Sequence, residues 1–147
     1  MKKQTALSKQ ACPCGSRCRY ANCCEPLHQG KRVADSAETL MRSRYCAFAK
    51  SKVGYLIKTT HPNGSTYEKD TIKWRKSLKS HCKSTQFLGL KILATSNDSP
   101  TTATVTFHAS LVRAGQDLSF TEKSKFEKVK GRWLYIDPSD LQVNKPW

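Results

Sequence analysis

The hydrophobic residues between positions 36 and 84 recur at helical spacing. The clearest apolar face consists of Ala37, Leu40, Met41, Tyr45 and Phe48. This spacing predicts a helix, whose start Asp35 or Ser36 would cap. Shorter runs predict a second helix over 53–59, which stops before His61-Pro62, and a third helix over 66–83.

From Gln86 the hydrophobic period changes to two, which is typical of β-strands. Four such runs are separated by turn sequences at 97–100, 114–117 and 130–131. On their apolar faces we place Leu88, Leu90, Ile92 and Ala94, then Ala103, Val105, Phe107, Ala109 and Leu111, then Leu118, Phe120 and Phe126. Three helices followed by four antiparallel strands predict an α+β fold with the helices on one face of the sheet. Phe107, Leu90 and Phe120 are expected in its core.

The first 31 residues contain only three large apolar side chains, Leu7, Tyr20 and Leu27, but five cysteines lie between Cys12 and Cys24. Cys12 and Cys14 form a C-x-C pair, and Cys23 and Cys24 are adjacent. Two thiol pairs joined by a short loop suit tetrahedral zinc, with Zn–S bonds near ~2.3 Å. A structural zinc supplies roughly 10–16 kcal/mol of apparent binding energy, which a segment with so little to bury needs. We therefore predict structural Zn²⁺ bound by Cys12, Cys14, Cys23 and Cys24.

Other interpretations of the cysteines are weaker. The odd total of seven and the lack of an apolar leader sequence disfavour a disulfide framework and favour a cytoplasmic protein with reduced thiols. A redox pair formed by Cys23 and Cys24 remains an alternative, and Cys18 or His28 could replace one of the four ligands. Ligation by two adjacent cysteines requires a turn or a helix start at that point.

The cysteine pattern C-P-C-G-S-x-x-x-Y-x-x-C-C resembles the SEC-C zinc motif of the SecA translocation ATPase. The segments Leu40–Phe48, Tyr55–Lys58, His61-Pro62 and Arg132–Asp137 resemble the YchJ family of bacterial proteins over nearly the whole chain. The resemblance implies a zinc module followed by a domain similar to nuclear transport factor 2, a cone of three helices packed on a curved antiparallel sheet. It divides the chain into a module over 1–33, the α+β domain over 34–141 and a tail over 142–147. In this chain Arg17-Cys18 replaces the usual Gly-Lys of the motif.

The formal net charge is +15, and it is unevenly distributed. Residues 1–85 hold 18 of the 26 lysines and arginines but only 5 of the 11 acids. A lysine face is often only a solvated surface, but here it accompanies a zinc module and favours an anionic partner: RNA, the ribosome or an acidic protein. The residues expected at this contact are Arg17, Arg19, Lys69, Lys73, Lys76, Lys79 and Lys83. Nothing in the chain predicts membrane insertion, and similar folds often form dimers.

A second class of function is a small-molecule binder or enzyme that uses the cavity of the cone. The candidate lining residues are Arg44, Tyr45, His61, Trp74, Tyr135 and Asp137. No nucleophile with a base and no pair of carboxylates accompanies them, and four thiolates leave zinc no open position. We therefore favour binding over catalysis, in a basic adaptor protein.

Overall fold

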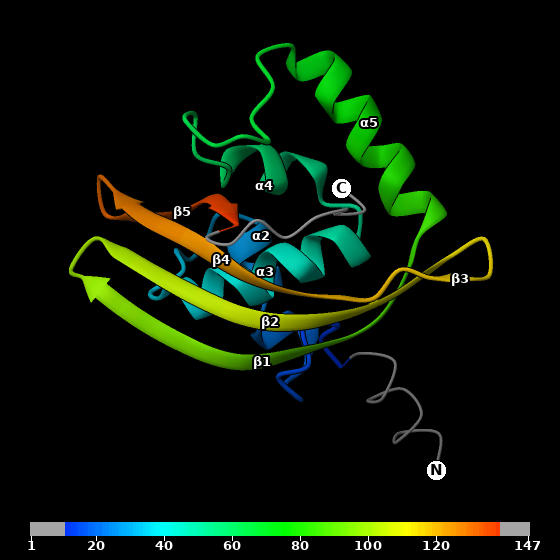
Figure 1. Cartoon of the computed structure of the whole chain (residues 1–147), viewed down its shortest axis with the longest axis horizontal. Helices are drawn as coiled ribbons and strands as arrows, with labels where there is room; N and C mark the ends of the chain where they lie inside the picture. Colours follow the sequence, from blue (N-terminus) through cyan, green and yellow to red (C-terminus); the bar gives the residue numbers. More distant parts are fainter. Residues whose placement is uncertain (1–10, 139–147) are drawn as a thin grey trace.

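Five strands form one antiparallel sheet in the computed structural model, which describes residues 11–138. They are β1 (Gln86–Ser99), β2 (Thr102–Arg113), β3 (Gln116–Asp117), β4 (Phe120–Val129) and β5 (Arg132–Pro138). The order is β1-β2-β4-β5, and the short β3 pairs with the end of β2. The helices lie on one face of the curved sheet, which confirms the predicted α+β cone (Figure 1). The predicted tail 142–147 and residues 1–10 lie outside the described residues.

The helices are η1 (Tyr20–Asn22), α2 (Glu25–His28), α3 (Ala37–Ala49), α4 (Val53–Lys58) and α5 (Thr71–Ser84). Ser36 caps α3 by accepting a hydrogen bond from the Thr39 amide at 3.1 Å. Helix α5 begins five residues later than the predicted 66–83. Its start is set by Asp70, whose carboxylate accepts from the amide of Lys73 at 3.1 Å. Lys69 therefore precedes the helix.

The predicted apolar face of β1 is wrong at two of its four positions. Leu88 is 64% exposed, and Ala94 is exposed as well. Register shifts between Phe87 and Gly89 and between Ile92 and Ala94 explain both errors, because each extra residue reverses the faces of the strand. Phe87, Leu90 and Ile92 consequently pack against the core.

The main core lies between the sheet and α3. Phe107 is 2% exposed and meets Phe120 edge-on, with ring centroids 5.8 Å apart. Leu90 and Phe120 are partly buried against the same cluster. From the helix side, Tyr45 is buried there, and its hydroxyl accepts a hydrogen bond from the Gly89 amide at 2.9 Å. The three predicted core positions are thus confirmed.

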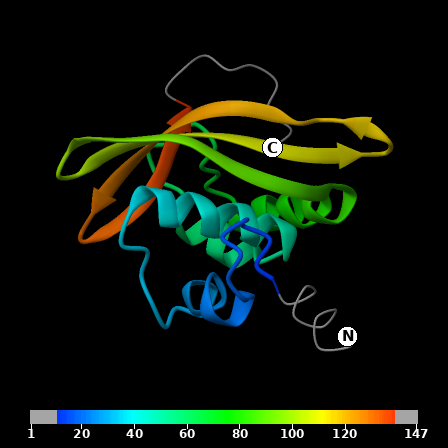
Figure 2. The same ribbon diagram turned by 90° about the horizontal axis from the view of Figure 1, so that it is seen from below.

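Helix α3 lies between the sheet and the N-terminal segment that holds the cysteines (Figure 2). Nine of its thirteen residues are buried, so it is covered on both sides. We refer to residues 11–33 as the cysteine module.

Phe107→Ala is expected to lower the free energy of unfolding by about 3–5 kcal/mol, because it leaves a cavity in a fully packed site. Leu88→Ala removes a similar side chain from the solvent side of the bulge, and its cost should stay within about 0.5 kcal/mol. Urea unfolding of both variants measures this. Equal midpoints would contradict the assignment of faces in the sheet.

Candidate metal centre and cavity

Four cysteine sulfurs meet in the cysteine module. The Sγ atoms of Cys12, Cys14, Cys23 and Cys24 all lie within 4.8 Å of one another. The Cys14–Cys23 separation is 3.6 Å and the Cys23–Cys24 separation is 3.9 Å. Tetrahedral Zn–S bonds of ~2.3 Å require sulfurs roughly 3.8 Å apart, so the group fits such an ion. All seven cysteines of the chain are free thiols, and these four could hold a metal ion.

The local backbone brings the two pairs together. The Cys12 amide donates to the carbonyl of Cys18 at 2.8 Å and closes the first loop. Gly15 has φ +81°, a conformation that residues with a Cβ rarely adopt. Cys24 is the N-cap of α2, so the adjacent pair occupies a helix start. This is the geometry that ligation by neighbouring cysteines requires.

The two alternative ligands are placed elsewhere. Cys18 is exposed, and its thiol points to the Ser16 carbonyl at 3.9 Å. Both ring nitrogens of His28 already have partners. Nε2 donates to the Ser43 carbonyl at 2.9 Å, and Nδ1 therefore accepts from the Tyr20 hydroxyl at 2.8 Å. Burial lowers the pKa of His28, which agrees with this neutral ring.

Helix α3 supplies a fifth thiol that the sequence reasoning missed. Cys46 is completely buried, and its Sγ lies 3.6 Å from that of Cys12. One turn earlier, Arg42 donates to the Cys14 carbonyl at 2.8 Å. One turn later, the Lys50 ammonium lies 4.4 Å from the centre of the Tyr20 ring. Arg42, Cys46 and Lys50 are four residues apart and therefore share one face of α3, opposite the predicted apolar stripe. This spacing could have indicated a second contact surface on the helix.

A cavity of about 370 Å³ lies between α3, α4, α5 and β5. Three of the predicted lining residues border it: Arg44, Trp74 and Tyr135. Its apolar wall also includes Phe48, Leu56 and Leu78, which the sequence reasoning did not assign to it.

The other three predicted lining residues lie outside this cavity. Tyr45 packs in the main core instead. The Nε2 atom of His61 contacts the Glu127 carboxylate at 2.8 Å. Asp137 accepts a hydrogen bond from the Ser65 amide at 2.8 Å and so fixes the loop before α5.

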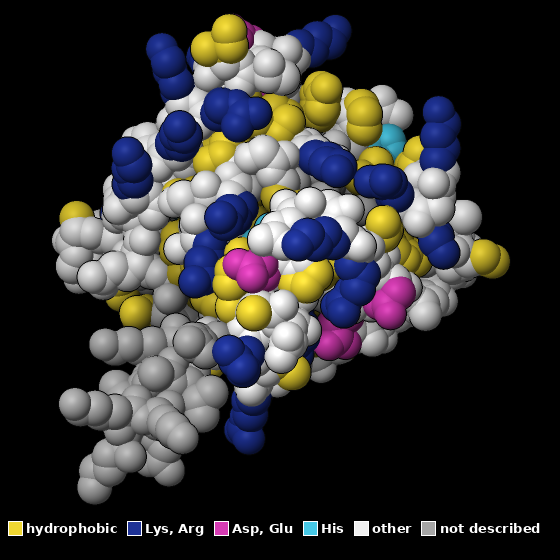
Figure 3. Space-filling view, turned by 180° about the vertical axis from the view of Figure 1, so that it is seen from behind, with side chains coloured by type: hydrophobic (Ala, Val, Ile, Leu, Met, Phe, Trp, Pro, Cys, Tyr) yellow, Lys and Arg dark blue, Asp and Glu magenta, His cyan; other side chains and the backbone are white. Residues whose placement is uncertain are grey.

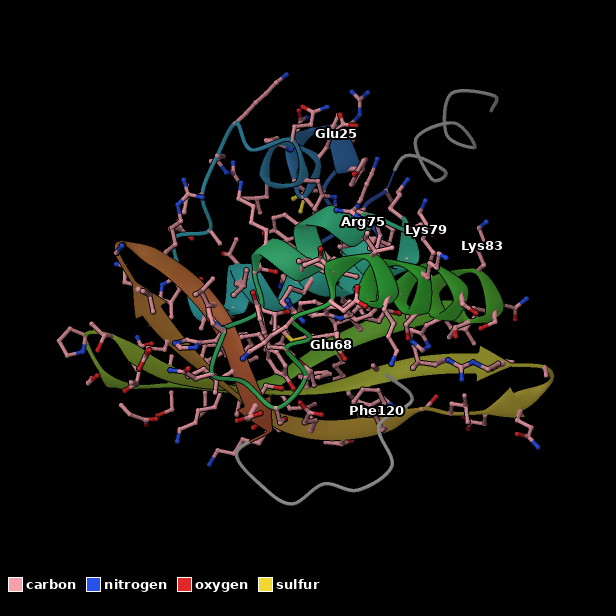
Figure 4. The ribbon with its side chains drawn as sticks, turned by 90° about the horizontal axis from the view of Figure 1, so that it is seen from above. Glu25, Glu68, Arg75, Lys79, Lys83 and Phe120 are labelled. Carbon is pink, nitrogen blue, oxygen red and sulfur yellow. The ribbon has the colours of Figure 1, made fainter. Side chains whose placement is uncertain are left out.

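The predicted basic residues are all exposed but belong to separate segments. Arg17 and Arg19 lie in the cysteine module, Lys69 precedes α5, and Lys73 borders the cavity. Lysine and arginine side chains cover much of the face turned away from the viewer in Figure 1, with few acids among them (Figure 3). Arg75, Lys79 and Lys83 project from the side of α5 away from the sheet (Figure 4). Arg75 was not among the predicted residues.

The cone-shaped domain and the thiol cluster define an NTF2-like protein with a SEC-C type module. Residues 36–138 match the family model of the YchJ middle NTF2-like domain. The chain belongs to the YchJ family. It is 39% identical to the UPF0225 protein YchJ of Shigella dysenteriae, over 92% of this chain and 87% of that protein. A UPF0225 protein of Haemophilus influenzae is 36% identical, over 92% of this chain and 81% of its own length.

Two solved structures resemble both parts of the molecule. A SEC-C motif containing protein from Rhodopseudomonas palustris has a TM-score of 0.76 at 34% identity, over 89% of this chain and 98% of that chain. A SEC-C motif containing protein from Psychrobacter arcticus has a TM-score of 0.74 at 30% identity, over 95% of this chain and 88% of that chain. Across residues 11–138, no helix has the length and apolar character needed to cross a membrane.

A substitution at Gly15 tests how closely the cysteine module packs against the sheet. A Cβ at this position would lie 2.9 Å from the Leu90 carbonyl oxygen in β1, whereas a Cβ on Gly30 meets nothing within 4 Å. Both glycines have positive φ, +81° and +75°, so alanine strains the two backbones alike. We expect Gly30→Ala to cost about 1–2 kcal/mol and Gly15→Ala an additional ~1–3 kcal/mol from the clash. Equal losses of unfolding free energy in the two variants would show that Gly15 does not pack closely against β1.

Proposed function

We propose that the protein is a cytoplasmic docking module in which structural Zn²⁺ orders the cysteine module and a basic surface binds RNA. The cations that carry the proposal come from two segments and lie on the helix side of the molecule. We define this basic surface by the following exposed residues: Arg17, Arg19, Lys69, Arg75, Lys76, Lys79 and Lys83.

Zinc is the metal that the four thiolates favour. Four sulfur ligands at tetrahedral spacing are typical of structural zinc sites, which contribute directly to folding. The site also lies against α3, so the metal would fix the orientation of Arg17 and Arg19 relative to the α+β domain. The proposed role of the ion is therefore to position cations rather than to perform catalysis.

Charge composition favours an anionic partner. The acids near this surface are few, and no ion pair within residues 11–138 engages its lysines or arginines. Phosphates repeat along RNA at regular spacing, so well-separated solvated lysines can neutralise them without a shape-matched pocket. An acidic protein is the competing partner.

The zinc proposal predicts one Zn²⁺ per chain. Cys23→Ser should lower the zinc content and disorder residues 11–30, while the sheet keeps its core around Phe107. Cys18→Ser should retain the metal, because its exposed thiol lies outside the cluster. Elemental analysis under reducing conditions gives the stoichiometry, and limited proteolysis locates the disorder. Loss of zinc in Cys18→Ser alone would reassign the ligands.

The docking proposal predicts a strong salt dependence of RNA binding. Changing Lys79 and Lys83 to Gln should reduce the slope of log K against log salt by about 1.4–1.8, at ~0.7–0.9 per phosphate contact. The matched control changes Lys91 and Lys125, two exposed lysines of the sheet, and should leave the slope unchanged. Fluorescence anisotropy with a labelled single-stranded RNA measures both.

Two results would reject RNA as the partner of the basic surface. One is an unchanged slope in the α5 variant. The other is binding to an acidic polypeptide, such as polyglutamate, at salt concentrations that abolish binding to RNA.

A further inference from the structure

A buried cation borders the cavity between α5 and β5. Arg44 is only 7% exposed, and it interrupts the apolar stripe of α3 between Leu40 and Phe48. Burial lowers the pKa of its guanidinium to about 10, which leaves the group protonated at neutral pH. A buried charge is costly unless other groups compensate it. The contacts of Arg44 therefore indicate what the cavity can accept.

Neighbouring protein groups accept hydrogen bonds from one nitrogen of the guanidinium. The Nη1 atom donates to the Leu56 carbonyl at 3.1 Å and to the Thr59 and Thr60 hydroxyls at 2.8 and 3.2 Å. These three acceptors are neutral. Within residues 11–138, no hydrogen bond uses Nε or Nη2 as a donor, and no carboxylate forms an ion pair with Arg44.

The surroundings hold the guanidinium in place. Its central carbon lies 4.7 Å from the centre of the Tyr135 ring. Glu122 attracts it through space, but this carboxylate does not line the cavity and accepts hydrogen bonds from Ser124 and Tyr135. Arg44 is therefore pre-organised, with one edge available for a further acceptor.

The rest of the lining limits the size and character of a guest. Phe48, Leu56, Trp74 and Leu78 supply apolar surface, and about 370 Å³ is within the usual range for small-molecule sites. Burial and the nearby Arg113 lower the pKa of His81 to about 4, so this lining residue is neutral at pH 7. Glu68 and Lys73 are exposed members of the lining, and Glu68 lies on the sheet side of α5 (Figure 4).

We propose that this cavity binds a small organic carboxylate, with its carboxylate on Arg44 and its apolar body against Trp74 and Leu78. A planar guanidinium with two adjacent free donors matches a carboxylate in a bidentate pair. An amide or alcohol of the same shape would leave the buried charge uncompensated. This binding site is separate from the basic surface and goes beyond the proposed docking function.

The test compares 3-phenylpropionate with its neutral amide by isothermal titration calorimetry on the zinc-loaded full chain. The acid should bind at least tenfold more tightly than the amide. In NMR spectra, the side-chain Nε–H of Arg44 and the indole N–H of Trp74 should shift as the acid is added. Similar affinity for acid and amide, or no saturable binding at millimolar concentration, would overturn the proposal.

Two variants identify the site, and a third serves as control. Arg44→Gln removes the charge and should abolish the preference for the acid. Leu78→Trp fills the cavity while keeping Arg44, so it should abolish binding even if Arg44→Gln fails to fold. Lys76→Gln changes an exposed cation of α5 that does not line the cavity, and it should bind the acid as the parent does.

Loss of binding in Lys76→Gln with retention in Leu78→Trp would place the acid on the outer surface instead. Leu78→Trp should keep the salt slope for RNA, so failure of one proposal is distinguishable from failure of the other.

Discussion

The double burial of α3 is the constraint on which the rest of the structure depends. One face of this helix packs Leu40 and Tyr45 against the sheet, and the opposite face presents Arg42 and Cys46 to the cysteine module. A helix covered on both sides cannot rotate or shift to accommodate one neighbour without disturbing the other, because packed interiors leave little free space. The register of α3 thus fixes three things together: the position of the thiols, the floor of the cone and the placement of Arg44.

The cysteine module shows how chemistry can replace a hydrophobic core. Of residues 11–34, only Leu27 and Ala34 belong to the main buried apolar cluster, and further contacts to α3 include hydrogen bonds from His28 and Arg42 and the Cys12–Cys46 sulfur contact. Individual hydrogen bonds of this kind contribute about 0.5–1.5 kcal/mol each, which is too little to order the loops between the cysteines. A metal ion bound by four of the thiols would supply the missing free energy at one point. The fifth thiol, Cys46, lies outside this group of four and is completely buried, as free cysteines often are.

The sequence predicted the elements whose signals are local and missed the features that depend on distant contacts. The apolar stripe of α3 and the C-x-C and C-C pairs are short-range patterns, and both correspond to what the structure contains. The bulge at Leu88 could not be predicted, because an extra residue is recognised only through its pairing with β2. Cys46 was missed for a similar reason, since its partner Cys12 is 34 residues away. The start of α5 was predictable in principle, because Asp70 is a good N-cap, but the helical period of the residues before it concealed the boundary.

Helix α5 contributes residues to both proposed binding sites, the cavity on its inner side and the basic surface on its outer side. Its inner side carries Trp74 and Leu78 to the cavity, whereas Lys76, Lys79 and Lys83 are exposed. Only two of its fourteen residues are buried, compared with nine of thirteen in α3, so packing holds α5 in place less firmly than it holds α3. A ligand that contacts the inner side and a partner that contacts the outer side would both act on the position of this one helix. If the ligand changes the affinity for the partner, thermodynamic linkage requires the partner to change the affinity for the ligand by the same factor. Helix α3, which is buried on both sides, supplies the charge of Arg44, and the less buried α5 supplies the apolar wall that faces it.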